Sequence, residues 1–341
     1  MNHVFRRVVA ACSLGALSMF AMLVPFRAEA ALTFDSSPYL HPQRLIDVRG
    51  RRMNIYCTGH GAPTVVLGTD SKLGTPAWRL VQPLIAKHTR VCSYDSAGVG
   101  FSDPATTMLD ASSQVTDLHQ LLNSAGIAPP FVIAGYQNSG LYARLYADRY
   151  PREVVGMVLV APNVPDQRER LSAIAPALAP FLAQVVPFDR HCTAAAERRQ
   201  MHADASAFSM CMYTPSDVTM PNALKYLIGQ ERERPSWWQA YSATDDSETA
   251  SSSEVVRDQR KYDDIPLIVL TTTKDIDSLP IPKNQKTSLV RAWLSWQQGL
   301  AKLSHRGVDF VVQGSTQDVP IDRPTAVVSA IDEVVDQARY R

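Results

Sequence analysis

Two short segments of the chain gather polar side chains between an apolar run and a helix-like run. Residues 134–141 read Ala-Gly-Tyr-Gln-Asn-Ser-Gly-Leu, and residues 314–324 read Gly-Ser-Thr-Gln-Asp-Val-Pro-Ile-Asp-Arg-Pro. Turns of this kind can expose one side chain for chemistry at the end of a strand. The central residues here are Gln137 and Gln317. A carboxamide can donate and accept hydrogen bonds, but it cannot serve as a general base near neutral pH.

Apolar runs alternate with amphipathic stretches along most of the chain. This alternation predicts an α/β protein with helices on both faces of a mostly parallel sheet. Between residues 165 and 264 no clear strand is visible, and several helix-like stretches remain. Residues 243–253 are polar and rich in small residues, which predicts an exposed loop. The expected strands are 52–57, 64–67, 90–94, 131–134, 154–160, 266–270 and 308–312, and the clearest helices are 138–150, 288–303 and the one that begins at 324.

The segment 94–104, Tyr-Asp-Ser-Ala-Gly-Val-Gly-Phe-Ser-Asp-Pro, is a strand end followed by a glycine-rich turn. It resembles the YDRAGxGxSDP loop of the α/β-hydrolase superfamily, with Ser96 where arginine is usual. Segments 63–67, 143–147 and 156–160 match the same superfamily in the same order. The resemblance covers residues 50–165 closely and 265–338 more loosely. It implies the α/β-hydrolase fold, a doubly wound, mostly parallel sheet with an inserted helical cap.

The resemblance places Gln137 where the superfamily carries its nucleophile, in a turn usually written Gly-x-Ser-x-Gly. Gly135 is kept, and Ser139 stands where a second small residue is needed. The sharp turn is therefore expected without its reacting atom. Ser139 is a weak candidate for a displaced nucleophile, since such a shift would break the match downstream.

The same resemblance places Gln317 at the general-base position. In the superfamily the acid usually follows one of two strands. After residues 154–160 this chain has Ala161, and after residues 266–270 it has Asp275 and Asp277, both weak candidates. Members of a triad act as a unit, so losing one lowers turnover by about 10⁴- to 10⁶-fold. We therefore expect a degenerate triad.

The turn that would form an oxyanion hole follows residue 67, and it contains Asp70, Ser71 and Lys72. An oxyanion hole aims N–H groups at developing negative charge, which the carboxylate of Asp70 opposes. With these three residues, Tyr136 and Asn138 are expected to line the pocket.

Residues 1–7 carry two arginines, residues 8–25 form an apolar run, and Ala28-Glu29-Ala30 supplies a small-x-small pattern. This pattern predicts a signal peptide cleaved after Ala30, with an uncleaved membrane anchor as the alternative. A cleaved signal peptide predicts that the mature protein is periplasmic or secreted. The predicted mature organisation is a core of 31–164, an inserted helical cap of 165–264, and a second part of the core, 265–341.

Four cysteines remain beyond the leader: Cys57, Cys92, Cys192 and Cys211. In an exported protein they indicate two disulfides, although the sequence permits three pairings and free buried thiols remain an alternative. The fold implied by the resemblance runs the strands of Cys57 and Cys92 side by side and antiparallel. We therefore predict the pairs Cys57–Cys92 and Cys192–Cys211.

Charge and motifs narrow the function further. The formal net charge is +1 and no basic stripe is visible, which argues against a nucleic-acid partner. No metal spacing is present, no cofactor is expected, and beyond the N-terminal run no membrane segment is visible. The first hypothesis is an exported pseudoenzyme that binds a small ligand or a partner. The alternative is an active esterase-like hydrolase whose rearranged site uses Tyr136, Ser139, Asp70, Lys72 and Asp318.

Overall fold

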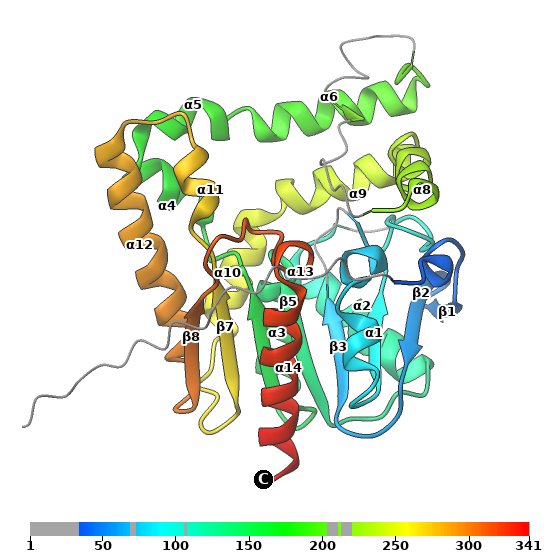
Figure 1. Ribbon diagram of the computed structural model, residues 1–341. Coiled ribbons are helices and arrows are strands. Elements are labelled where there is room, and N and C mark those ends of the chain that lie inside the picture. The colour runs from blue at the N-terminus through cyan, green and yellow to red at the C-terminus, as the bar shows by residue number, and fades with distance from the viewer. Residues whose placement is uncertain (1–33, 69–72, 106–107, 203–210, 213–219, 341) are drawn as a thin grey trace, which may run out of the picture. The chain divides into compact units, whose positions relative to one another are not determined.

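The computed structural model describes residues 34–340, apart from 69–72, 106–107, 203–210 and 213–219. Within this part of the chain a single sheet runs in the order β1-β2-β4-β3-β5-β6-β7-β8 (Figure 1). Its strands are β1 (Arg44–Val48), β2 (Arg51–Thr58), β3 (Thr64–Gly68), β4 (Val91–Tyr94), β5 (Phe131–Tyr136), β6 (Val154–Val160), β7 (Leu267–Thr271) and β8 (Gly307–Val311).

The sheet is parallel from β4 to β8, while β2 pairs antiparallel with both β1 and β4. In parallel strands the carboxyl ends meet at one edge, where ligands of open α/β sheets bind. The turn after β5, the turn after β6 and the loops after β7 and β8 therefore share that edge. These are the segments that carry Gln137, Ala161, Asp275 and Gln317.

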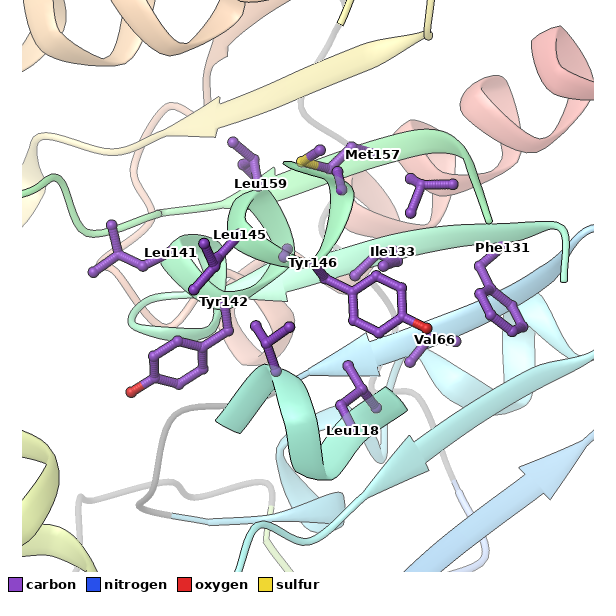
Figure 2. Packing of buried hydrophobic residues seen from close by; sticks show 14 of the residues in the cluster. Val66, Leu118, Phe131, Ile133, Leu141, Tyr142, Leu145, Tyr146, Met157 and Leu159 are labelled. Carbon is purple, nitrogen blue, oxygen red and sulfur yellow. The ribbon is translucent and has the colours of Figure 1, made fainter. Parts of the chain in front are cut away.

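Helices cover both faces of the sheet, as the alternation of apolar runs predicts. One core cluster joins the sheet to α2 (Ala111–Ser124), α3 (Ser139–Arg149) and α12 (Lys283–Ala301). Figure 2 shows part of this cluster, including Leu118 of α2, Leu145 and Tyr146 of α3, and Val66 and Phe131 of the sheet. On the other face α1 (Gln82–Ile85) and α14 (Pro324–Arg339) bury a second cluster. Two short helices, α11 (Lys274–Ser278) and α13 (Val319–Asp322), follow β7 and β8.

A helical cap is inserted between β6 and β7, as predicted. The expectation of an exposed loop at 243–253 is wrong, because this stretch completes one helix and begins another. Its serines are structural: the hydroxyl of Ser251 accepts from the N–H of Ala111, and that of Ser252 accepts from the N–H of Asp166. The cap helices are α4 (Gln167–Ile174), α5 (Ala179–Leu182), α6 (Val185–Glu197), α8 (Asn222–Arg232), α9 (Pro235–Asp246) and α10 (Glu248–Asp258).

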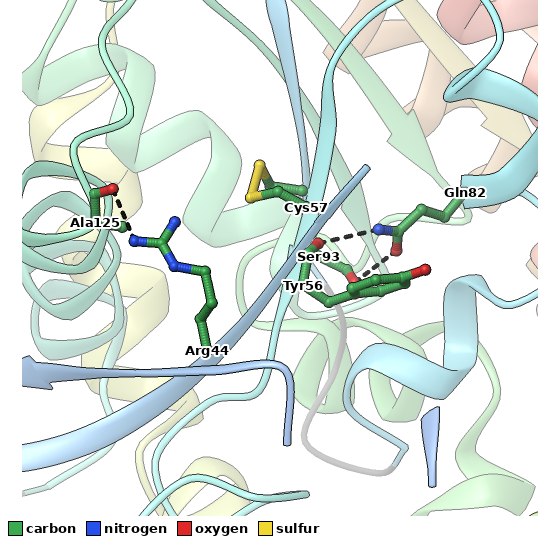
Figure 3. Close-up of a disulfide and its surroundings, with 7 residues drawn as sticks. Arg44, Tyr56, Cys57, Gln82, Ser93 and Ala125 are labelled. Carbon is green, nitrogen blue, oxygen red and sulfur yellow. Dashed lines mark hydrogen bonds between the residues drawn. A yellow bond between two sulfur atoms is a disulfide. The ribbon is translucent and has the colours of Figure 1, made fainter. Parts of the chain in front are cut away.

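Both predicted disulfides are confirmed. Cys57 of β2 and Cys92 of β4 face each other in the antiparallel register, with Cα atoms 4.0 Å apart (Figure 3). Beside this bond Gln82 donates to the carbonyl of Tyr56 and accepts from Ser93, so helix α1 is tied to the same two strands. Cys192 and Cys211 join α6 to the chain that follows it.

Residues 1–30, the expected signal peptide, lie outside the described part of the chain. Among the residues that the structure does describe, no helix combines the length and apolar character that a bilayer crossing requires.

Candidate functional site

The turn between β5 and α3 has the geometry that the sequence predicts. Gln137 adopts a φ of +52°, a left-handed conformation that is costly for a residue with a side chain. Its N–H donates to the carbonyl of Val160, and its own carbonyl accepts from Gly140 at 2.9 Å. Gly135 is required here, since a Cβ at this position would lie 2.4 Å from the carbonyl oxygen of Ser139. The strained turn is therefore preserved although its central residue is glutamine.

Ser139 is buried at the first turn of α3. A Cβ added to Gly68 would lie 2.0 Å from its Oγ, so the hydroxyl faces the end of β3. It also hydrogen-bonds the hydroxyl of buried Tyr94. The structure thus places Ser139 against the sheet, where it packs as a small residue beneath the turn.

A chain of hydrogen bonds holds the side chain of Gln137. The hydroxyl of Tyr136 donates to Oδ1 of Asp318, and Nε2 of Gln137 donates to the Tyr136 hydroxyl at 2.9 Å. Because a carboxylate accepts only, the phenol must give its proton to Asp318 and accept from the amide. These two bonds fix the orientation of the Gln137 carboxamide, whose NH₂ group points toward Tyr136. Trp78 packs edge-on against the Tyr136 ring, with centroids 6.2 Å apart.

The base position and one candidate acid meet at the same edge of the sheet. The backbone N–H of Gln317 donates to Oδ2 of Asp275 at 2.6 Å, while the Gln317 side chain is exposed. Burial raises the pKa of Asp275, and the nearby carboxylates Asp318 and Asp322 raise it further, while the bond from Gln317 opposes them. Asp277 lies on the exposed side of α11. Of the two carboxylates after β7, only Asp275 contacts the base position.

The other acid position offers no polar side chain. Ala161 is buried at the end of β6 with a φ of +42°, and its N–H donates to the carbonyl of Leu270. Asp70, Ser71 and Lys72, the residues expected in the oxyanion loop, lie outside the described part of the chain. In the part that is described, no group of three or more His, Cys, Asp or Glu side chains could hold a metal ion.

A cavity of about 140 Å³ lies between the start of α3 and the cap. Nδ2 of Asn163 donates to Oδ1 of Asn138 at its wall, and Arg168 forms an ion pair with Glu248. One arginine stands against two carboxylates, so the lining carries a formal charge of −1. The lining residues are Asn138, Leu141, Tyr142, Asn163, Gln167, Arg168, Thr244, Asp245, Glu248 and Ser251.

Comparison with known proteins agrees with this geometry. The family described as serine aminopeptidase, S33, matches residues 76–220, which include the turn at Gln137. An esterase from Thermogutta terrifontis superposes with a TM-score of 0.57 at 18% identity, covering 86% of this chain and 97% of its own. The chain has the α/β-hydrolase fold, and these matches support its assignment to the α/β-hydrolase superfamily.

Sequence relatives of this α/β-hydrolase match over shorter stretches. The AB hydrolase superfamily protein of Gibberella zeae is 32% identical over 105 residues, which are 30% of this chain and 33% of that protein. The protein YbdG of Bacillus subtilis is 26% identical over 125 residues, 36% of this chain and 38% of its own length. The match thus spans about a third of the length of each relative.

Sequence reasoning missed the cap side of the cavity in this α/β-hydrolase. Arg168, Thr244, Asp245 and Glu248 come from three cap helices, and none belongs to a recognisable motif. The polar stretch 243–253 was the available signal. Ser251 and Ser252 of this stretch bond to backbone N–H groups at the starts of other helices, and Asp245, Glu248 and Ser251 line the cavity.

Proposed function

We propose that this α/β-hydrolase is an exported pseudoenzyme that binds a small polar ligand between its core and its cap. The observation that carries the proposal is the carboxamide of Gln137, which occupies the nucleophile turn and is hydrogen-bonded to Tyr136. Gln317 at the base position adds support, because it offers no group that accepts a proton near neutral pH. The two disulfides support export, since such bonds persist in oxidising compartments.

The cavity supports a ligand of defined character. Its volume of about 140 Å³ is close to that of an engineered cavity that holds benzene, about 150 Å³. Amide and hydroxyl groups on its walls favour a partner with several hydrogen-bonding groups. A lining of net negative charge disfavours anions, so we expect a small uncharged or cationic molecule that carries hydroxyl groups.

The alternative function is an active hydrolase with a rearranged site. The hydrogen bond from Tyr136 to Asp318 favours it, because a carboxylate that accepts a phenol proton resembles an acid–base pair. We rank it second, because the hydroxyl of Ser139 packs against the end of β3 and hydrogen-bonds Tyr94.

Labelling with a fluorophosphonate, which marks activated serines, separates the two functions. We expect the mature protein to remain unlabelled, and we expect p-nitrophenyl acetate to hydrolyse in its presence only at the background rate. The double variant Gln137→Ser/Gln317→His should become labelled at position 137 and gain ester turnover, since Asp275 already contacts the loop of residue 317. Labelling or turnover by the unaltered protein that disappears with Tyr136→Phe would establish the alternative.

Ligand binding is tested with probes of matched size. Saturation-transfer NMR with neutral polyols should give signals that Gln167→Trp abolishes, because this change fills the cavity. The control Gln298→Trp places the same side chain at an exposed position of α12 and should leave the signals unchanged. Polyol signals that persist in Gln167→Trp, or binding of carboxylates alone, would contradict the proposed site.

A further inference from the structure

Helix α8 of the cap docks on the core through one face. Leu224, Ile228 and Glu231 follow one another at spacings of four and three residues, which places them on the same side of the helix. Leu224 and Ile228 are fully buried with Tyr39, and Leu73 packs against them. The acidic side chain of Glu231 is therefore buried on the same side of the helix as these apolar residues, next to buried Arg232.

Glu231 is nearly inaccessible, with 6% of its surface exposed. One carboxyl oxygen accepts from the backbone N–H of Gly100 in the loop after β4. The other, Oε2, has no hydrogen-bond partner among the described residues. A buried carboxylate with an unsatisfied oxygen costs far more free energy than a buried neutral carboxylic acid, so the site favours the protonated form.

One acidic neighbour of Glu231 adds to this preference. Asp95 lies across the Gly100 backbone and accepts from the N–H of Thr75, the amide of Asn54 and the N–H of Phe101. These three donors favour a charged Asp95, although burial raises its pKa. A negative Asp95 opposes a second charge on Glu231.

Two arginines act in the other direction. Arg232 and Arg234 both favour the charged form of Glu231. Nη2 of Arg234, however, donates to the carbonyl of Gly100 at 2.7 Å, and Arg232 stacks over the ring of Trp237. The positive charges of both arginines lower the pKa of Glu231 and so oppose the effects of burial and of Asp95.

We propose that Glu231 is a pH-sensitive latch: its neutral form lets α8 dock on the loop around Gly100, and its ionisation releases the helix from the core. The latch goes beyond ligand binding, and it holds whether or not the cavity is occupied. The latch involves helix α8, which packs against the loop of residues 95–103. This helix lies far along the chain from the turn at Gln137.

The direction of the response follows from proton linkage. Burial, followed by the charge of Asp95, raises the pKa of Glu231 from 4.5 to about 8. The docked helix therefore holds the proton more tightly than the released one. Docking is most stable below the ordinary pKa of a glutamate, weakens as pH rises, and loses this contribution above pH 8. Between these limits the docking equilibrium falls by about tenfold per pH unit.

Hydrogen exchange of the full mature protein tests the latch. After correction for intrinsic rates, protection of the amides of 222–232 should fall by about fiftyfold between pH 6 and pH 8 and level off above pH 8. In Glu231→Gln, which keeps an acceptor for Gly100 but cannot ionise, protection should change by less than about threefold over this range. Amides of α3 serve as the internal reference and should show no such trend.

A matched control is the exposed carboxylate two residues further on, Glu233→Gln, which should keep the wild-type response. Protection of α8 that does not depend on pH in the wild type would overturn the proposal. So would a Glu231→Gln variant that folds and retains the full pH response. A loss of the response in Glu233→Gln as well would assign it to the helix terminus in general and would also overturn it.

Discussion

The side chain of Asp275 accepts a hydrogen bond at 2.6 Å from the backbone of Gln317, 42 residues further along the chain. The loops after β7 and β8 meet at this bond, one carrying an acid and the other the position of a base. In a working triad this acid would orient an imidazole. Here a hydrogen bond also joins the two loops, but the base position holds Gln317, whose side chain is exposed.

The chain of bonds through Tyr136 should stabilise the site. Tyr136→Phe leaves the carboxylate of Asp318 and the amide of Gln137 without their shared partner, so we expect a loss of about 1–3 kcal/mol in the free energy of unfolding. Tyr340→Phe, at a 90% exposed position, should change it by less than about 0.5 kcal/mol. Urea denaturation measures both. Equal effects of the two changes would mean that this network contributes nothing specific.

The nucleophile turn should tolerate no side chain at residue 135. Gly135→Ala brings its Cβ to 2.4 Å from a backbone oxygen, and we expect a loss of about 2 kcal/mol or more. Gly299→Ala, in α12 with nothing within 4 Å of the added Cβ, should instead stabilise the protein by about 1 kcal/mol through helix propensity. Thermal denaturation distinguishes the signs, and a stable Gly135→Ala would show that the turn is looser than its contacts indicate.

Each disulfide should constrain the unfolded chain according to the loop that it closes. Separations of 35 and 19 residues correspond to about 4 kcal/mol for Cys57–Cys92 and about 3 kcal/mol for Cys192–Cys211. Paired replacement of each bond by serines, followed by urea denaturation, measures these contributions. Peptide mapping without reduction checks the pairing, and a peptide joining Cys57 to Cys192 would contradict it.

Asp148 should make stability depend on pH in a lower range than Glu231. Burial raises the pKa of Asp148 to about 6, against opposing bonds from the N–H of Arg260 and from Tyr262. The folded state therefore binds this proton more tightly, and the stability it confers is present below pH 4 and is lost as pH rises through 6. Asp148→Asn should remove this part of the slope in unfolding midpoints from pH 4.5 to 7. Asp264→Asn, at an exposed position, should leave the slope intact.

The nucleophile turn could be predicted from the sequence because it is local. Gly135, Gln137 and the helix from Ser139 lie within a few residues of one another, so the backbone conformation and the missing reacting atom follow from the order of residues alone. The strands of the parallel sheet could be predicted for a similar reason, since their apolar runs are continuous. The first strand, Arg44–Val48, was missed because it is an edge strand with an exposed pattern.

Only the tertiary structure decided the features that depend on distant residues. Whether Asp275 or Asp277 contacts the base position depends on how the loops after β7 and β8 meet. The polar stretch 243–253 is helical because Ser251 and Ser252 bond to backbone groups more than 80 residues away. Glu231 has the sequence of an ordinary surface glutamate, and its burial arises from the docking of α8 on the loop around Gly100. The sequence determines which groups are present. Long-range packing determines which of these groups are buried and which of them are in contact.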